Sequence, residues 1–207
     1  MKKVQDHYFK MAKQDNYPAR SVYKLEEVQK KYGILKKGNK VLDLGCQPGS
    51  WSMYAAGIVG ASGQVVGVDL TDVMIGRPAS SAGSAIRFIC ADIMMPETIT
   101  LIKAIQSRFD IVLSDIAPRT TSSKWADQQR SLALSIQTHA VAVELLKSGG
   151  NYYCKVFEGE GFKDFFDAVR RDFRVAKIVK PQSSRKESRE VFVLGIDYIG
   201  SRTGEPE

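Results

Sequence analysis

Residues 40–51 read Lys-Val-Leu-Asp-Leu-Gly-Cys-Gln-Pro-Gly-Ser-Trp, and this stretch decides the fold class. Its first five residues form a short, mainly apolar run that is typical of a buried strand. The glycines that follow allow a tight turn, and the residues beyond it have the pattern of a helix over about 50–60. A strand, a glycine turn and a helix in direct succession indicate the opening of an α/β sheet.

The same alternation continues along the chain and predicts a mostly parallel sheet covered by helices on both faces. At the C-terminal end, eight polar residues join the last two strands, and a link that short cannot hold a crossover helix. We therefore expect those two strands to form an antiparallel hairpin. The further strands are predicted at 64–69, 86–91, 110–114, 150–157, 173–180 and 189–196. The further helices are predicted at 21–32, 97–107, 125–147 and 161–172. Gly149-Gly150 ends the pattern of the helix at 125–147.

Length and composition predict one domain over residues 1–200, with a basic helical extension at 1–38, a Rossmann-like core at 39–198 and a disordered tail at 199–207. No apolar run approaches the roughly 20 residues that span a bilayer, so we expect no membrane partner. The N-terminus lacks the apolar stretch of a signal peptide, and three scattered cysteines suit reduced thiols in the cytoplasm. With two histidines, the chain has little material for a metal site.

The positive charge is concentrated at the two ends of the chain. Residues 1–40 hold eleven Lys or Arg against four Asp or Glu, and residues 170–190 hold eight against three. Those local excesses of +7 and +5 leave −5 for the remainder of a chain whose net charge is +7. The distribution indicates either a polyanion-binding surface assembled from both ends or an ordinary solvated surface.

The turn after the first strand has the form of a ligand-binding loop. Gly45 and Gly49 let a ligand approach the backbone, and the following helix offers free N–H groups. A nicotinamide-binding loop needs a glycine where Gln47 stands, which argues against a nicotinamide oxidoreductase. Asp69 and Asp92 follow the next two strands, where carboxylates can accept the ribose hydroxyls and the adenine amino group of a nucleoside. Each of these also fits an ordinary turn, helix cap or surface charge, but together they favour an adenosine-bearing ligand without phosphates, S-adenosylmethionine.

Four further charged residues stand at informative places. Asp115 ends the fourth strand, Glu190 begins the last one, and Lys24 lies on the helix at 21–32. Lys155 lies inside the apolar fifth strand, where a lysine is costly unless it is paired. A structural salt bridge between Lys155 and Asp115 and a catalytic role for Lys155 both explain this placement.

With these motifs the sequence resembles the FtsJ-type ribose 2′-O-methyltransferases over almost its whole length. The resemblance implies the class I S-adenosylmethionine-dependent methyltransferase fold, a seven-stranded, mostly parallel sheet with a C-terminal antiparallel hairpin. The motifs that carry it are Ala19-Arg20-Ser21-Val22-Tyr23-Lys24-Leu25, Asp43-Leu44-Gly45, Pro48-Gly49-Ser50-Trp51-Ser52, Ser114-Asp115-Ile116-Ala117-Pro118, Lys155-Val156-Phe157-Glu158-Gly159-Glu160-Gly161, Lys180-Pro181 and Glu190-Val191-Phe192.

The resemblance also implies the roles of individual residues. The family's catalytic Lys–Asp–Lys–Glu set falls here on Lys24, Asp115, Lys155 and Glu190. Lys155 then either removes the proton of a ribose 2′-hydroxyl or stays charged and steers its oxygen. The family's cofactor contacts fall on Gly49, Trp51, Asp69, Asp92 and Asp115.

The expected partner is RNA, with 23S rRNA in the large ribosomal subunit as the substrate and a monomer as the working form. Two alternatives stay open: a tRNA anticodon-loop methyltransferase, whose eukaryotic branch also has serine at the position of Ser50, and a catalytically silent RNA-binding protein. Tyr8, Phe9 and Tyr17 either stack on bases or pack against the domain. The basic residues expected to flank the site are Lys2, Lys3, Lys10, Lys13, Arg20, Lys180, Arg185 and Lys186.

Overall fold

The structure, a computed structural model, describes residues 7–73, 85–118, 121–185 and 188–200. Three lysines of the predicted RNA-facing surface, Lys2, Lys3 and Lys186, lie outside the described residues. The same holds for the predicted tail from residue 201 onward.

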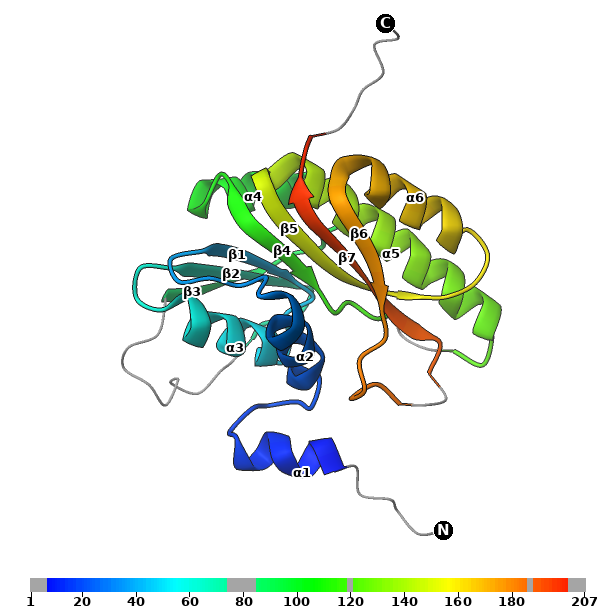
Figure 1. The fold of residues 1–207 in the computed structure, drawn as a ribbon, viewed down its shortest axis with the longest axis horizontal. Helices are drawn as coiled ribbons and strands as arrows, with labels where there is room; N and C mark the ends of the chain where they lie inside the picture. The colour runs from blue at the N-terminus through cyan, green and yellow to red at the C-terminus, as the bar shows by residue number, and fades with distance from the viewer. Residues whose placement is uncertain (1–6, 74–84, 119–120, 186–187, 201–207) are drawn as a thin grey trace, which may run out of the picture.

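The strands form one seven-stranded sheet in the order β3-β2-β1-β4-β5-β7-β6 (Figure 1). The first five strands pair in parallel, and β7 is antiparallel to both of its neighbours. This confirms the predicted mostly parallel sheet with an antiparallel C-terminal pair. The strands are β1 (Lys40–Leu44), β2 (Gln64–Asp69), β3 (Ala85–Cys90), β4 (Phe109–Ser114), β5 (Leu146–Phe157), β6 (Phe173–Val179) and β7 (Glu190–Tyr198).

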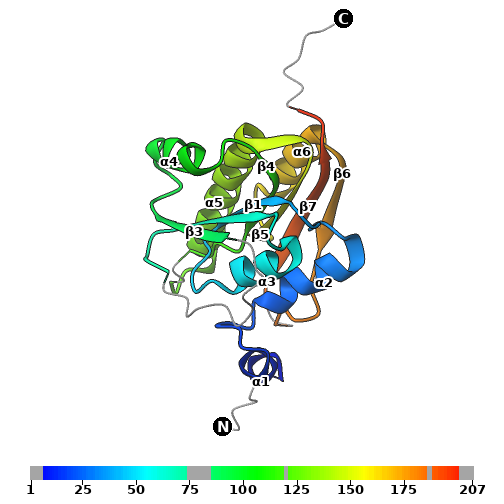
Figure 2. The same ribbon diagram turned by 90° about the vertical axis from the view of Figure 1, so that its left-hand side faces the viewer.

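Helices cover the two faces of this sheet, as the alternating pattern predicted (Figures 1 and 2). On one face α2 and α3 pack against the strands in one buried cluster, and on the other α4, α5 and α6 do so in a second cluster. α1 lies beyond this body, near the N-terminus, and buries only Ala12 among its own residues. The helices are α1 (His7–Gln14), α2 (Val22–Tyr32), α3 (Ser50–Val59), α4 (Glu97–Ile105), α5 (Lys124–Leu145) and α6 (Phe162–Asp172).

The junction between α5 and β5 differs from the prediction, which ran the helix on to the glycine pair. α5 ends at Leu145, because Leu146 has extended backbone angles and pairs with Phe109 of β4. The register then shifts, and regular pairing resumes at Asn151. The glycine pair therefore lies within an irregular part of β5 and does not end the helix.

The topology brings several strand ends to one edge of the sheet. The strand order changes direction between β1 and β4, and ligands of open α/β sheets bind at the carboxyl ends of strands beside such a switch. Because β7 runs antiparallel, its first residue lies at the same edge as the last residues of the parallel strands. Among the described residues, no helix is long and apolar enough to span a membrane.

Candidate active site

Two adjacent strand ends bring the predicted Asp115 and Lys155 together. β4 and β5 pair in parallel up to Ser114 and Cys154, so the next residue of each strand reaches the same edge. The Lys155 ammonium donates hydrogen bonds to the backbone oxygen of Asp115 at 2.6 Å and to its Oδ1 at 2.8 Å. An ammonium has three donors, so one N–H direction of Lys155 is left for another group.

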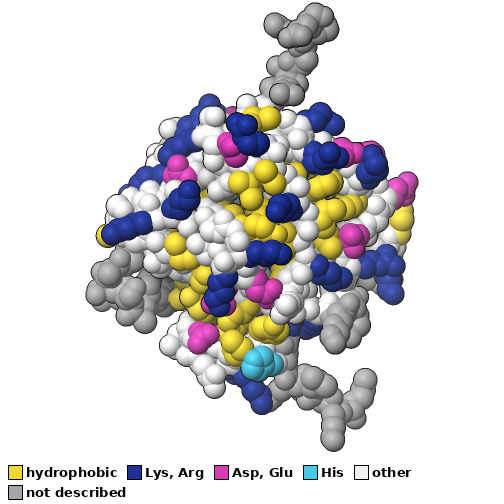
Figure 3. Space-filling view, viewed as in Figure 1, with side chains coloured by type: hydrophobic (Ala, Val, Ile, Leu, Met, Phe, Trp, Pro, Cys, Tyr) yellow, Lys and Arg dark blue, Asp and Glu magenta, His cyan; other side chains and the backbone are white. Residues whose placement is uncertain are grey.

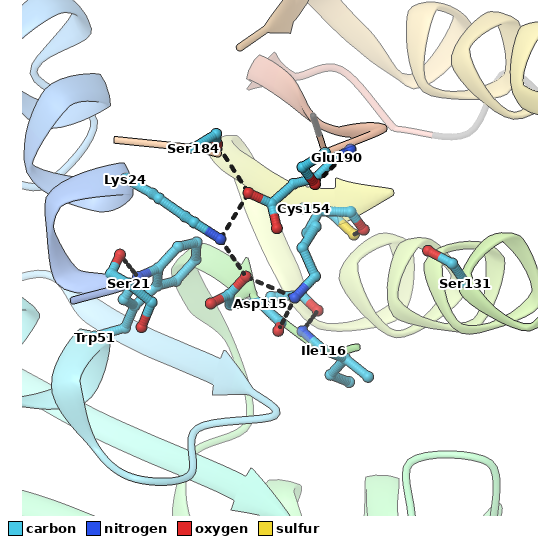
Figure 4. Close-up of polar contacts among 12 residues, drawn as sticks. Ser21, Lys24, Trp51, Asp115, Ile116, Ser131, Cys154, Ser184 and Glu190 are labelled. Carbon is cyan, nitrogen blue, oxygen red and sulfur yellow. Dashed lines mark hydrogen bonds and ion pairs between the residues drawn. The ribbon is translucent and has the colours of Figure 1, made fainter. Parts of the chain in front are cut away.

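Lys24 and Glu190 extend this pair into a chain of alternating charges (Figure 4). Lys24 Nζ lies 2.7 Å from Glu190 Oε1 and 3.8 Å from Asp115 Oδ1. The Ser184 hydroxyl donates to Glu190 Oε1 at 2.8 Å, which ties that carboxylate to the β6–β7 connection. The order Glu190–Lys24–Asp115–Lys155 therefore places each cation next to an anion.

Burial makes this pairing necessary. Lys24, Lys155 and Glu190 are between 6% and 9% exposed. An unpaired charge at such a depth costs several kcal/mol or neutralises, whereas opposite charges in contact offset the loss of water. The four residues come from α2, the β4 end, β5 and β7, so the site requires the whole sheet and α2 to be in place. The set proposed from the sequence thus lies within one cluster.

The glycine loop beside this cluster has backbone angles that let a ligand approach the main chain closely. Gly45 has φ +74, and a Cβ there would lie 2.2 Å from Ile116 Cγ1, so only glycine fits. Gly49 has φ +103 and immediately precedes α3. The first N–H groups of α3 have no partners within the helix and form an anion-attracting end. The N–H groups of Gly45, Cys46, Gln47 and Gly49 already have partners, so a ligand at this loop would be held by the first N–H groups of α3.

Asp69 and Asp92 follow β2 and β3 along the same edge. Asp69 accepts hydrogen bonds from the Gln47 N–H at 3.1 Å and from both the backbone and the hydroxyl of Thr71, so it braces the glycine loop. Asp92 accepts from the Met94 N–H at 2.9 Å and caps the turn that leads to α4. Both side chains are partly exposed, which leaves lone pairs of each carboxylate available to a ligand.

Trp51 occupies a different place from the other predicted cofactor contacts. Its indole is 3% exposed, stacks on Tyr153 at 5.6 Å between ring centroids, and donates from Nε1 to the Ser21 carbonyl at 2.7 Å. The side chain therefore fastens α3 to the segment that leads into α2. A contact from Trp51 to a cofactor would have to come from its backbone N–H in the first turn of α3.

The sequence interpretation missed Asp43, which is fully buried in β1 one strand away from Asp115. The Ser52 hydroxyl donates to its Oδ2 at 2.6 Å, while Oδ1 has no hydrogen-bond partner. The pKa of Asp43 is raised to about 7, mainly by burial and also by the charges of Asp115 and Asp69, against the opposing effect of the hydrogen bonds from Ser52. A charged residue inside an apolar strand was the signal that singled out Lys155, and it applied equally to Asp43.

Basic residues from both ends of the chain meet near the site. Burial lowers the pKa of Arg20, the like charge of Arg185 lowers it further, and Glu190 opposes both, so these three side chains share one electrostatic neighbourhood. Lys31 and Lys177 both lie over the ring of Tyr32, at 5.3 and 5.0 Å from its centroid. Lys and Arg side chains are spread across this face of the molecule (Figure 3).

The other residues predicted to face RNA differ in their exposure to solvent. Lys10, Lys13, Lys180 and Arg185 are exposed, and Lys13 lies over the ring of Phe9 at 4.9 Å. Tyr8 and Tyr17 pack beside buried Ala12, Val22 and Tyr23, whereas Phe9 is 46% exposed. Of the three N-terminal aromatic residues, only Phe9 therefore keeps a largely open ring.

Comparison with known proteins assigns the family. Residues 17–198 match the FtsJ-like methyltransferase family. The chain belongs to this family. It is therefore a methyltransferase, and the family implies a methyl donor of the S-adenosylmethionine type. No cluster of three or more potential metal ligands occurs in the part of the chain that the structure describes.

The relatives cover this methyltransferase almost from end to end. A protein of Desulfotalea psychrophila named ribosomal RNA large subunit methyltransferase E is 52% identical over 96% of this chain and 98% of its own. A protein of the same name from Desulfosudis oleivorans is 45% identical over 97% and 96%. The crystal structure of a Plasmodium falciparum protein described as a ribosomal RNA methyltransferase superposes with a TM-score of 0.76 at 24% identity, covering 89% of this chain and all of that one, and supports the fold.

Proposed function

We propose that this methyltransferase transfers a methyl group from S-adenosylmethionine to a ribose 2′-hydroxyl of 23S rRNA in the large ribosomal subunit. The observation that carries the proposal is the buried chain Glu190–Lys24–Asp115–Lys155 beside the Gly45 loop. The substrate is taken from the relatives named ribosomal RNA large subunit methyltransferase E. All four charged residues come from one chain, so a monomer suffices.

The residues around the loop fit the methyl donor. The charges of Asp69 and Asp115 both raise the pKa of buried Asp43, which indicates a negative field at this edge that suits a sulfonium and an ammonium group. In the proposed arrangement Asp69 accepts the ribose hydroxyls, Asp92 accepts the adenine amino group, and backbone N–H groups near Gly49 face the carboxylate. When bound, S-adenosylmethionine supplies a methyl carbon that its sulfonium has already activated.

The protein's remaining task is to position the ribose oxygen and remove its proton. We assign Lys155 as the base in its neutral form, after its third proton has passed to solvent: two N–H bonds donate to Asp115, and the lone pair of Nζ faces the ribose hydroxyl and takes its proton. Lys24 keeps Asp115 in place from the other side, and Glu190 with Ser184 keeps Lys24 in place. The neighbouring Arg20 and Arg185 bind phosphates that flank the target.

Two variants of Lys155 separate the possible roles. Lys155→Ala removes the nitrogen and should abolish turnover while leaving equilibrium binding of S-adenosylmethionine near the wild-type value. Lys155→Arg keeps the charge and the donors but cannot release a proton, so its turnover should also fall to background. Near wild-type turnover by the arginine variant would give Lys155 a steering role, and equal loss of cofactor binding and turnover would make it structural.

The deciding experiment offers labelled S-adenosylmethionine with undermethylated large ribosomal subunits, small subunits and tRNA in parallel. Label in the large subunit alone, at a 2′-hydroxyl, is the expected result. Label in tRNA alone would overturn the rRNA assignment, and no label in any RNA would favour a silent binding protein. Ser50 does not favour the tRNA reading, because its buried hydroxyl accepts the Ala19 N–H at 2.8 Å and so has a structural use.

A further inference from the structure

Trp125 is a large aromatic side chain that the packing of the domain does not use. It is 66% exposed, whereas the second tryptophan of the chain, Trp51, is 3% exposed. Trp125 lies in the first turn of α5, which Ser123 caps by accepting the Ala126 N–H. An exposed tryptophan alone is unremarkable on a protein surface, so its position relative to the active site decides what it can do.

A row of contacts fixes that position. One face of α5 follows the end of β5 turn by turn (Figure 4 shows Ser131 beside this strand). Ser135 donates to the Lys155 carbonyl at 3.0 Å, Ser131 accepts the Phe157 N–H at 3.1 Å, and Gln128 donates to the Glu160 carbonyl at 2.9 Å. Trp125 continues the row, since its indole N–H points at Glu160 Oε2 at 3.4 Å.

These contacts give the separation, along the axis of α5, between Trp125 and the level of Lys155. Ten residues of helix separate Ser135, at the level of Lys155, from Trp125, which corresponds to about 15 Å along α5. A single-stranded RNA whose ribose lies at Lys155 covers that distance within a few nucleotides. Trp125 is therefore within reach of a base a few nucleotides away from a ribose at Lys155, on the side of the site away from Lys24.

The support under the ring is rigid. At Gly159 an added Cβ would lie 2.7 Å from the Gln128 side chain, and at Gly161 it would lie 2.7 Å from Leu132, so the β5–α6 turn is drawn tightly against α5. Buried Asp127 holds the preceding loop by accepting from the backbone and the hydroxyl of Thr121. The tight turn fixes the helix that carries the ring, the indole N–H has a polar contact with Glu160, and most of the ring surface stays open to a base.

From this arrangement we propose that Trp125 is a stacking platform for an unpaired base of the RNA substrate, a few nucleotides from the methylated ribose. The proposal rests on the RNA substrate proposed above. Exposed Lys124 and Arg130 lie on the same end of α5 and supply charge for the adjoining phosphates. The contact is indifferent to base identity, because every base has a π-face, and it adds affinity and positioning without a sequence code.

The test measures equilibrium binding without the cofactor, using the full chain and two probes. One probe is a 12-nucleotide single-stranded adenylate RNA, and the other is the same ribose–phosphate chain without bases. Trp125→Ala should weaken binding of the adenylate RNA by roughly 5- to 100-fold, the range for losing one stacked base. Trp125→Phe should retain most of the affinity, and none of the variants should change binding of the baseless chain.

A matched control and a spectroscopic signal complete the design. Ile136, 52% exposed on the same helix, serves as the control, and Ile136→Ala should bind RNA like the wild type. Tryptophan emission should fall when the adenylate RNA binds the wild type and should not respond in Trp125→Phe, where only buried Trp51 remains. Unchanged affinity in Trp125→Ala, equal quenching by the baseless chain, or quenching that persists in Trp125→Phe would overturn the proposal.

The outcome is separable from the test of the proposed function. Methyl transfer to large subunits is scored on the wild type by incorporated label, whereas stacking is scored by binding in the absence of methyl donor. Absence of methyl transfer with base-dependent quenching of Trp125 would overturn the reaction and keep the platform. Methyl transfer by the wild type with unaltered RNA binding by Trp125→Ala would keep the reaction and overturn the platform.

Discussion

Replacing Asp43 by asparagine tests whether burial controls the charge of the carboxylate under the cofactor loop. Water is excluded from this side chain, one carboxyl oxygen has no hydrogen-bond partner, and its pKa is raised from the model-compound value of 3.8 to about 7. Asparagine has nearly the same shape and retains an oxygen that can accept the Ser52 hydroxyl. It cannot ionise, so the variant lacks this titration altogether.

The size and sign of the effect follow from linkage. A folded-state pKa above the unfolded value means that the folded protein binds this proton more tightly. The contribution of Asp43 to the free energy of unfolding is therefore fully present below about pH 4 and is lost as the pH rises through about 7. A shift of about three pKa units at 1.36 kcal/mol each makes the loss about 4 kcal/mol.

Urea unfolding of the wild type and Asp43→Asn, at pH values from 4.5 to 8, measures this quantity. We expect the variant to gain stability over the wild type by roughly 1.4 kcal/mol per pH unit across the middle of that range and to keep a constant difference above it. His139, whose pKa burial lowers, titrates in both proteins and cancels in the difference. A difference that does not vary between pH 5 and 7 would refute the reasoning, whatever its absolute value.

Three further variants test other parts of the site. Gly45→Ala should lose at least 1–3 kcal/mol of stability in urea unfolding and should no longer bind S-adenosylmethionine by calorimetry, because φ is +74 and Ile116 fills the space. Trp51→Phe should lose about 0.5–1.5 kcal/mol, because it removes the indole hydrogen bond while the Ser21 carbonyl keeps the Lys24 N–H, yet its calorimetric affinity for the cofactor should stay at the wild-type value. Ser184→Ala should lose about 1.5–3 kcal/mol in urea unfolding and slow methyl transfer, since it removes one of the two contacts that hold Glu190 Oε1 and leaves the Lys24 pair alone, with cofactor affinity unchanged.

The strand pattern was readable from the sequence because buried parallel strands are short apolar runs between turn residues. β1 and β2 have the predicted bounds, whereas β3 begins one residue earlier than predicted, at Ala85. That strand lies at the sheet edge and is partly exposed, so polarity does not mark its ends. The sequence could not predict that β7 lies between β5 and β6, because either strand of an antiparallel pair can form hydrogen bonds with the edge strand of a sheet.

The sequence was most informative about the site where a charged residue interrupts an apolar strand. That criterion, with the family resemblance, proposed the four residues that the structure brings together. The resemblance also named Trp51 as a cofactor contact, but it could not predict that the side chain faces the core, because a residue that opens a helix can face a ligand with its backbone alone. Nor could it find Ser184, whose importance depends entirely on its hydrogen bond to Glu190.

The position of α2 links the two basic ends of the chain to the charged cluster proposed for catalysis. Lys24 and Glu27 are three residues apart on α2 and so lie on one side of the helix. Lys24 holds Glu190, while the Glu27 carboxylate accepts the backbone N–H groups of Gln182 and Ser183 at 2.7 and 2.9 Å. α2 is thereby fastened to the β6–β7 connection at the place where Arg20 approaches Arg185. The contacts that align the four charges proposed for catalysis thus also bring the basic residues together, so a variant that loosens this attachment should weaken RNA binding and turnover together.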